Sequence, residues 1–161
     1  MTREIPLTRG LVAIVDDADY ETAVSAGPWH ATPDRNRFYA RHTGPRRDGK
    51  HQTVRMHTVL TGWPFVDHVN GDGLDNRREN LRAATHSENA MNRAMNSDNT
   101  SGYKGVFRYP RGWRARITLA GRRTNLGVFA TPQEAARAYD TAALALFGEF
   151  ARLNFPEAVP R

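Results

Sequence analysis

The chain has 161 residues, of which 39% are hydrophobic and 25% are charged. This composition predicts a folded protein of one domain or two small ones. The chain has no cysteine, which excludes disulfide scaffolds, thiolate metal sites and cysteine nucleophiles. No apolar run approaches the roughly 20 residues that cross a bilayer, and the start lacks the apolar core of a signal peptide. We therefore expect an intracellular protein that acts in the cytoplasm and has no membrane partner.

The excess positive charge lies in the last third of the chain. Residues 1–98 carry 13 basic and 13 acidic side chains, whereas residues 99–161 carry 10 basic and 4 acidic ones. Only Lys50 and Lys104 are lysines, so the excess consists of arginine. Because the arginine fork suits phosphate and guanine, this segment predicts a nucleic-acid partner. A solvated basic face is the alternative.

Short elements are predicted before this basic segment. The expected strands are Leu11–Val15, Phe38–His42 and Gln52–Met56, the last two on either side of a basic turn at Gly44–Lys50; the expected helices are Asp19–Ala26 and Met56–Leu60. The polar stretch Arg93–Gly102 predicts a linker, and we place a domain boundary near Asp98.

A sheet backed by one helix is predicted after the linker. Apolar and cationic residues alternate over Trp113–Leu119, which is typical of a strand. The neighbouring strands are expected at Tyr103–Tyr109 and Arg122–Phe129. A capping box at Thr131 and Glu134 begins a helix that ends at Gly148. The alanines of this helix would pack on one face of the sheet, which leaves the arginines on the other.

The densest polar segment runs from Asp67 to Asn89. His68 follows an apolar run, Asn80–Ala83 predicts a second short strand, and a capping box at Thr85 begins a helix that carries Asn89. Folding this segment over would bring Asp67, His68 and Asn89 together. Their oxygens suit a hard cation such as Mg²⁺, and the imidazole could act as a general base. A structural hydrogen bond between the aspartate and the histidine is the alternative.

A long string of residues at fixed spacing surrounds this segment. It consists of Asp67-His68, Asn70-Gly71-Asp72, Leu74-Asp75-Asn76, Arg78–Arg82 and Thr85–Asn92, with His57 ahead of them. The string resembles the HNH nuclease motif, the ββα-metal fold, in its phage homing-endonuclease branch. The likeness extends over about residues 5–93.

The resemblance implies a role for each motif position. His68 would be the general base that activates water, and Asp67 and Asn89 would bind one divalent ion, Mg²⁺ or Mn²⁺. Asn80 would hold the loop beneath His68 through hydrogen bonds without doing chemistry itself. His57 is expected to be structural, with a phosphate contact as the alternative, and His86 is left open between DNA contact and solvation.

The implied activity is metal-assisted hydrolysis of phosphodiester bonds in duplex DNA, in a phage or bacterial setting. The alternative is a DNA-binding regulator whose nuclease motif has lost its activity. One site per chain allows one nick per binding event, or a dimer for two cuts, so monomer and homodimer both stay open.

A second string of residues covers the basic segment. It consists of Tyr103–Val106, Trp113–Ile117, Leu126–Phe129, Thr131–Asp140 and Arg152–Pro156. It resembles the AP-two type DNA-binding domain of plant ethylene-response factors, whose three-stranded sheet lies in the major groove. The residues expected to contact DNA are Lys104, Arg108, Arg111, Arg114, Arg116, Thr118, Arg123 and Asn125. Phe107 and Tyr109 stand where plant members place arginines, so the plant target sequence should not be transferred.

Taken together, the sequence predicts an α+β protein of two domains. An N-terminal ββα-metal HNH nuclease domain is expected over residues 1–98. A DNA-binding domain of three antiparallel strands packed on one helix is expected over residues 99–161.

Overall fold

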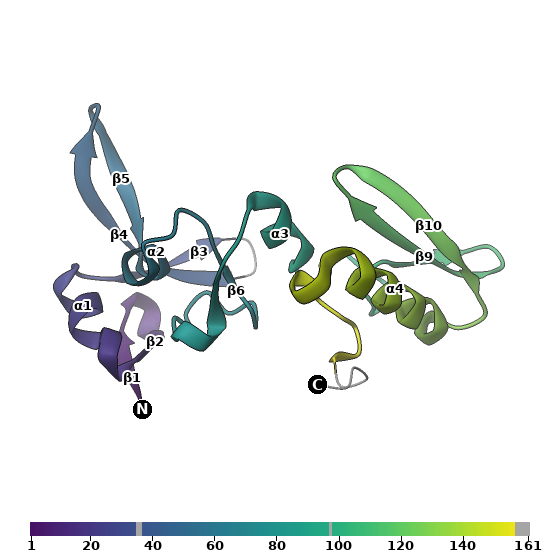
Figure 1. Ribbon diagram of the computed structural model, residues 1–161, viewed down its shortest axis with the longest axis horizontal. Coiled ribbons are helices and arrows are strands. Elements are labelled where there is room, and N and C mark those ends of the chain that lie inside the picture. The colour runs from purple at the N-terminus through teal and green to yellow at the C-terminus, as the bar shows by residue number, and fades with distance from the viewer. Residues whose placement is uncertain (35–36, 97, 157–161) are drawn as a thin grey trace. The chain divides into compact units, whose positions relative to one another are not determined.

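The computed structural model describes residues 1–34, 37–96 and 98–156. Residues 35–36, Ser97 in the predicted linker, and residues 157–161 in the predicted second domain lie outside the described residues. The chain divides into two compact units, Met1–Thr85 and His86–Arg161, called here the first and second unit. The fold is mixed α+β, as predicted (Figure 1). No described helix is both long and apolar enough to cross a membrane.

The first unit contains three small antiparallel sheets and two short helices. Its strands are β1 (Thr2–Pro6), β2 (Val12–Asp16), β3 (His30–Asp34), β4 (Arg37–Arg47), β5 (Lys50–Arg55), β6 (Val66–His68) and β7 (Leu81–Ala83). Its helices are α1 (Tyr20–Ser25) and α2 (Met56–Thr61), with 3-10 turns η1 (Thr8–Gly10), η2 (Asp17–Asp19) and η3 (Arg78–Asn80). The sheets have the orders β1-β2, β3-β4-β5 and β6-β7.

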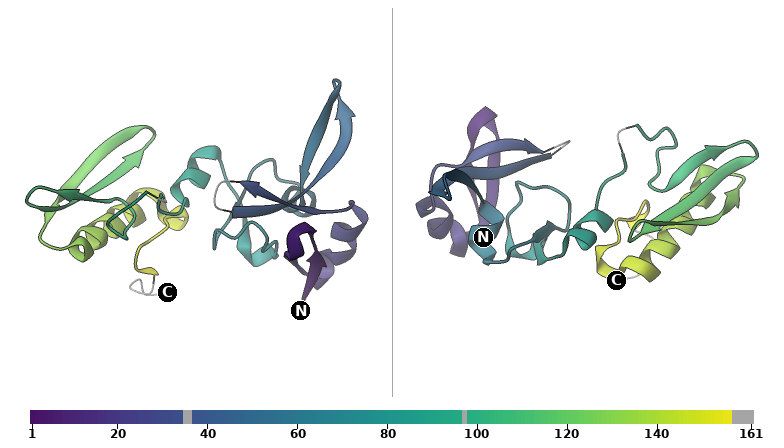
Figure 2. Two further views of the ribbon diagram at one scale, coloured as in Figure 1. Left: turned by 180° about the vertical axis from the view of Figure 1, so that it is seen from behind. Right: turned by 90° about the horizontal axis from the view of Figure 1, so that it is seen from above.

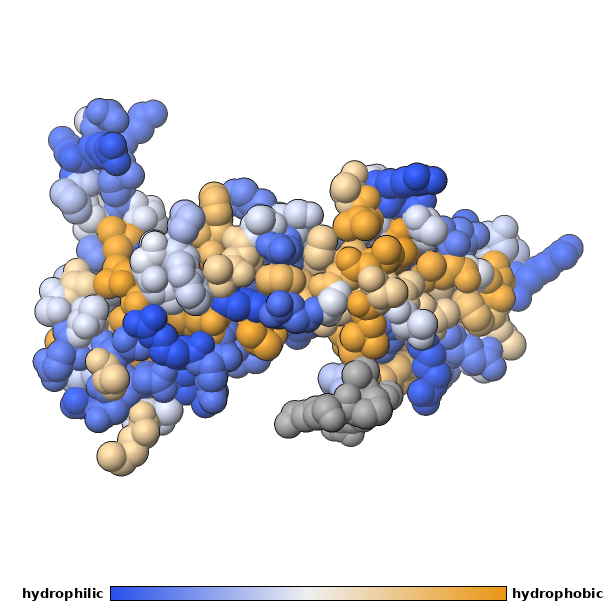
Figure 3. Space-filling view, in the orientation of Figure 1, coloured by the Kyte–Doolittle hydropathy of each residue, from blue (hydrophilic) through white to orange (hydrophobic). Residues whose placement is uncertain are grey.

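One apolar core holds the first unit together. It is formed by Ile5, Ala13, Val15, Ala23, Trp29, Ala40, Met56 and Leu60. The Trp29 indole N–H donates to the Ala23 carbonyl at 2.7 Å, so this large side chain is buried without leaving its donor unsatisfied. The core lies between α1, α2 and the sheets, whereas the outer end of the β4–β5 hairpin projects beyond it and is hydrophilic (Figures 1 and 3).

The second unit is one sheet packed on one long helix, as predicted (Figure 2). Its elements are α3 (His86–Met91), β8 (Val106–Tyr109), β9 (Gly112–Leu119), β10 (Arg122–Phe129), α4 (Pro132–Phe147) and η4 (Gly148–Phe150). Strand β9 pairs antiparallel with both neighbours. The capping box of Thr131 and Glu134 is present at the start of α4.

Close approach of the α4 alanines to the sheet makes the core of the second unit. Ala135, Ala136 and Ala143 are fully buried against residues of the sheet. Gly105 has φ +77°, and a Cβ there would lie 2.0 Å from the Tyr139 ring. Only glycine therefore fits both the backbone turn and the space beneath it.

Two sequence predictions about element boundaries need correction. Met56 begins helix α2 instead of ending a strand, and strand β8 starts at Val106 because the chain turns at Gly105. The division between the units falls after Thr85, earlier than the boundary predicted near Asp98. The reason is that α3 packs within the second unit: the Lys104 ammonium donates to the Met91 carbonyl at 2.6 Å.

Candidate functional site

Strands β6 and β7 position Asp67, a predicted metal ligand, and His68, the predicted general base. Asp67 and Arg82 are direct cross-strand partners, and the Asp67 carboxylate is only 4% exposed. Arg82 donates to Asp67 Oδ2 from Nε at 3.0 Å and from Nη2 at 2.6 Å. A buried carboxylate is stable as an anion when it has such a partner. This arginine was part of the recognised string of residues but was not predicted to hold the aspartate.

The loop between β6 and β7 is held by amide side chains. Asn80 accepts the Asn70 backbone N–H at 2.9 Å and donates to the Asp75 carbonyl at 2.7 Å. Asn70 Nδ2 donates to the Asp75 carboxylate at 2.9 Å. These hydrogen bonds, made by buried or half-buried groups, fix the course of the loop that leaves His68.

Ion pairs and backbone hydrogen bonds attach the same loop to the rest of the first unit. Arg78 binds both oxygens of Asp19 at 2.8 and 2.9 Å, and this contact lowers the pKa of the Asp19 carboxyl. The Asn76 N–H donates to the Ile14 carbonyl at 2.7 Å. Arg77 donates to both oxygens of Asp75 and lowers its pKa. The loop is therefore docked on β2 and η2, not exposed and unsupported.

His68 is a buried imidazole with a weakly basic character. His68 is 3% exposed. Burial lowers the pKa of its imidazole, although the hydrogen bond with Asn76 and the nearby acids oppose the shift. Asn76 Oδ1 lies 3.5 Å from His68 Nε2. Because an amide oxygen can only accept, this contact favours the tautomer with the proton on Nε2 and the lone pair on Nδ1. His68 is thus neutral near pH 7.

Two further rings surround His68. The His57 ring centroid lies 5.0 Å from that of His68, and the Tyr39 centroid lies 5.7 Å from it, all with edge-to-face geometry. Burial, the neighbouring imidazole and two arginines lower the pKa of His57 to about 3. The sequence analysis noted His57 and included Asn76 in the motif string, but it gave Asn76 no role beside His68. Nothing in the sequence pointed to Tyr39.

Asn89, the other predicted metal ligand, lies on α3 in the second unit, whereas Asp67 and His68 lie in the first. That Asn89 and Asp67 bind the same ion therefore stays a prediction. Among the described residues, no group of three or more histidine, cysteine or acidic side chains is arranged to hold a metal ion. A carboxylate oxygen and an amide oxygen, the donors that Asp67 and Asn89 offer, are of the kind that suits Mg²⁺ or Mn²⁺ bound with several waters.

On the sheet of the second unit, two arginine side chains of β9 lie over aromatic rings of β8. Arg114 lies 4.4 Å over the Tyr109 ring, and Arg116 lies 4.4 Å over the Phe107 ring. Ala115, between them on β9, is buried on the opposite face. The two aromatic residues that depart from the plant pattern thus support the guanidinium groups of the neighbouring strand.

The other predicted DNA contacts are spread over the strand ends and turns. Arg108 lies 5.0 Å over the Trp113 ring at the end of β8. Arg111, Thr118, Arg123 and Asn125 are exposed, and Asn125 accepts the Gly127 N–H at a bulge in β10. Arg111 lies in the turn between β8 and β9.

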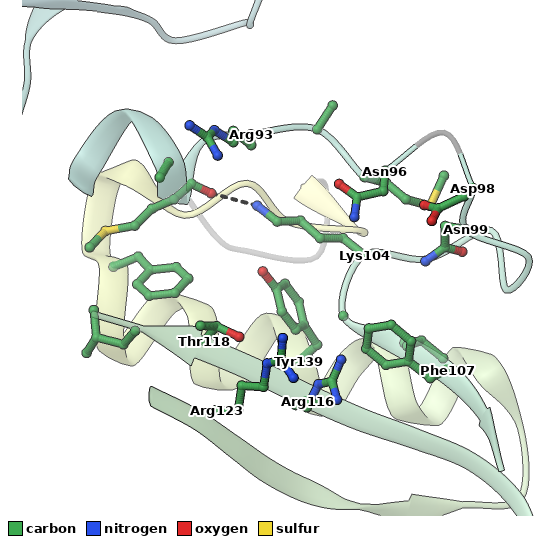
Figure 4. A pocket seen from close by; sticks show the side chains of 18 of the residues that line it. Arg93, Asn96, Asp98, Asn99, Lys104, Phe107, Arg116, Thr118, Arg123 and Tyr139 are labelled. Atoms are coloured by element: carbon green, nitrogen blue, oxygen red, sulfur yellow. Dashed lines mark hydrogen bonds between the residues drawn. The ribbon is translucent and has the colours of Figure 1, made fainter. Parts of the chain in front are cut away.

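A cavity of about 730 Å³ lies between the sheet and the segment that follows α3 (Figure 4). Arg116, Thr118 and Arg123 line it from the sheet, and Arg93 lines it from the overlying segment. Lys104 crosses this space to reach Met91 (Figure 4). The ammonium of Lys104 is therefore engaged within the second unit, and its predicted contact with DNA stays a prediction.

A family model described as HNH endonuclease matches residues 60–91, the segment that runs from the end of α2 through β6 and β7 to the end of α3. An uncharacterized HNH endonuclease of Acanthamoeba polyphaga mimivirus is 33% identical over 91 residues, which make up 56% of this chain and 46% of that protein. Protein 3.8 of Escherichia phage T7 is 33% identical over 92 residues, which make up 56% of this chain and 75% of that protein.

Plant proteins match as well. An ethylene-responsive transcription factor of Arabidopsis thaliana is 49% identical over 61 residues, 36% of this chain and 33% of that protein. The chain thus spans less than half the length of this factor and of the mimivirus protein. No solved structure matches the chain. The chain belongs to the HNH endonuclease family and combines its motif with an AP-two/ERF-like segment.

Proposed function

We propose that the protein is a metal-dependent endonuclease that hydrolyses phosphodiester bonds in duplex DNA, with His68 as the general base. The observation that carries this proposal is the pairing of a buried imidazole with an adjacent buried carboxylate on a hydrogen-bonded strand pair. A histidine whose pKa lies below its usual value is unprotonated at physiological pH and can accept a proton from water.

His68 Nδ1 is the atom proposed to take this proton. The contact with Asn76 holds the other ring nitrogen, and the rings of Tyr39 and His57 restrict the orientation of the imidazole. A base fixed in one orientation loses little entropy when it meets the attacking water. The proton moves from water to Nδ1 as the water oxygen attacks phosphorus.

Asp67 and Asn89 are the residues proposed to hold the divalent ion, in a ββα-metal arrangement of β6, β7 and α3. When bound, Mg²⁺ or Mn²⁺ would supply positive charge to the phosphate oxygens and to the leaving 3′ oxygen. Arg82 orients the Asp67 carboxylate through two hydrogen bonds to Oδ2. Asn80 supports this geometry from the loop.

The second unit is proposed to bring the nuclease to its target, as in a homing-type enzyme. Its sheet carries guanidinium groups on aromatic supports, outward from the face that packs on α4. A sheet of this kind can enter the major groove. Arg114, Arg116 and Arg123 are proposed to contact bases or phosphates, with Lys104, Arg108, Arg111, Thr118 and Asn125 around them. The phage and viral relatives support action inside an infected cell.

The experiment is a nicking assay on supercoiled plasmid with the full chain. We expect nicked product with Mg²⁺, none with EDTA, and none with His68→Ala in Mg²⁺. DNA binding without cleavage under all conditions would instead identify a DNA-binding regulator. Metal-independent cleavage, or cleavage by His68→Ala at the wild-type rate, would contradict the proposed mechanism.

A further inference from the structure

The β4–β5 hairpin is a basic feature of the first unit that the proposed chemistry does not use. Strand β3 pairs with β4 only over Arg37–Arg41, so beyond Thr43 the two strands β4 and β5 pair with each other alone. This outer part, Thr43–Thr53, is called the ribbon here. It projects from the first unit in two views turned by 180° (Figures 1 and 2).

The geometry of the ribbon is specified by its sequence. A bulge between Thr43 and Arg46 changes the register where the ribbon leaves the sheet, and bulges bend strands. A Cβ on Gly44 would lie 2.7 Å from Val54 Cγ2, so the two strands approach closely at this bend. At the tip, Asp48 and Gly49 both have positive φ, which is the conformation of a tight two-residue hairpin turn.

The ribbon carries charge and no apolar face. The exposed basic side chains of the ribbon are Arg46, Arg47, Lys50 and His51, and its only acidic side chain is that of Asp48. Arg46 Nε lies 3.2 Å from His51 Nε2. An isolated two-stranded hairpin is barely stable in water, and this one gains little from packing, because its outer end is hydrophilic (Figure 3). Its composition is suited to an anionic partner more than to the core of the first unit.

The root of the ribbon adjoins the rings around His68. Arg41 and Arg55 are direct partners at the base of β4 and β5, and both lower the pKa of His57. His57 follows on α2, and its ring meets that of His68 at 5.0 Å. The cations at the tip of the ribbon are therefore carried by the same two strands whose roots adjoin the proposed active site.

We propose that this ribbon is a second DNA-binding element, which enters a groove of the duplex beside the cleavage position and contacts phosphates through Arg46, Arg47 and Lys50. The major groove admits a two-stranded β-ribbon, and Arg and Lys are the usual phosphate contacts. The inference rests on the proposed function, since it takes duplex DNA as the substrate. It assigns part of the DNA affinity to the nuclease unit itself, independently of the sheet in the second unit.

The test compares two double variants of the full chain that lose the same charge. Arg46→Gln/Arg47→Gln alters the ribbon, and Arg3→Gln/Arg9→Gln removes two exposed cations elsewhere in the first unit. Duplex affinity is measured over a range of salt in EDTA, so that cleavage plays no part. Each phosphate contact contributes about 0.9 to the slope of log affinity against log salt. The ribbon variant should lower that slope by up to about 1.8, and the control should leave it near the wild-type value.

Equal slopes for wild type, ribbon variant and control would overturn the proposal, and so would equal losses in both variants. A ribbon that docks on an acidic protein surface would give the first of these results. Thermal unfolding of each variant checks that the first unit still folds, which is expected because both substituted arginines of the ribbon are exposed. If the ribbon variant shows the predicted change of slope but the wild-type chain does not nick DNA, the nuclease proposal is contradicted and the ribbon proposal stands.

Discussion

The two units of this protein arrange polar side chains in opposite ways. In the first unit, Asp67, His68, Asn76 and Asn80 are buried and hydrogen-bonded around one loop. In the second unit, small apolar residues fill the space between sheet and helix, and the charged side chains lie on the outer face. Buried polar groups perturb proton affinities, whereas surface guanidinium groups keep their charge. The first arrangement suits chemistry, and the second suits attachment to a polyanion.

The largest expected effect on stability tests the close packing of the second unit. Gly105→Ala puts a Cβ into the Tyr139 ring at a positive φ, so overpacking and backbone strain together should cost about 3–5 kcal/mol. Gly121→Ala is the matched control, because Gly121 has φ +79° with no atom within 4 Å. It should cost only about 1–2 kcal/mol. Urea unfolding measures both, and equal losses would contradict the packing argument.

The next effect tests the polar network of the first unit. Asn80→Ala removes one buried acceptor and one buried donor, which should cost about 2–3 kcal/mol of stability. Since the loop supports the site, cleavage should also slow by about 10- to 100-fold, as is typical for residues that orient others. DNA affinity in EDTA should not change. Asn80→Asp keeps the acceptor for Asn70 but replaces the donor to the Asp75 carbonyl with a carboxylate oxygen, so it should destabilise at least as much as Asn80→Ala. An unchanged cleavage rate in Asn80→Ala would show that the loop does not support the site.

A smaller effect concerns pH. His57 has a pKa of about 3 in the folded protein and about 6.5 when unfolded, so unfolding takes up a proton between these values. Stability should therefore be full above pH 6.5 and decline by about 1.4 kcal/mol per pH unit below it. His57→Gln should remove this share of the slope between pH 6 and pH 4.5, as followed by urea unfolding. Identical slopes would show that His57 is not buried in its neutral form.

The smallest effect sharpens the description of the DNA-binding face. Phe107→Leu keeps an apolar side chain but removes the ring beneath Arg116, so DNA binding should weaken by about 0.5–1 kcal/mol, or two- to fivefold. Leu146→Met, at an exposed position on α4, serves as a control and should bind as the wild type does. Equal affinities for all three proteins would mean that the ring does not position the guanidinium.

The sequence predicted the parts of the fold that depend on local patterns. The alternation of β9 and the capping box of Thr131 and Glu134 need only neighbouring residues, and both were found. The length of the β4–β5 hairpin was missed, because its outer end has no apolar alternation to reveal it. The packing of α3 within the second unit includes the hydrogen bond from the Lys104 ammonium to the Met91 carbonyl. No local sequence pattern predicts this contact between residues 13 positions apart.

The candidate site shows the same limit. Asp67, His68 and Asn80 could be selected from their spacing and from the family resemblance. Tyr39 could not, because its ring contacts with His57 on α2 and His68 on β6 join segments that are far apart in the sequence. The supporting role of Phe107 beneath Arg116 likewise depends on a diagonal contact between two strands.

The most direct test of the central claim is the single-turnover rate of strand cleavage at equal DNA occupancy for wild type and His68→Asn in Mg²⁺. The account predicts equal affinity for DNA and a rate lower by a factor of about 100 to 10,000 in the variant, the usual contribution of a general base. Cleavage at equal rates by the two proteins would contradict the assignment of His68 and, with it, the proposed mechanism.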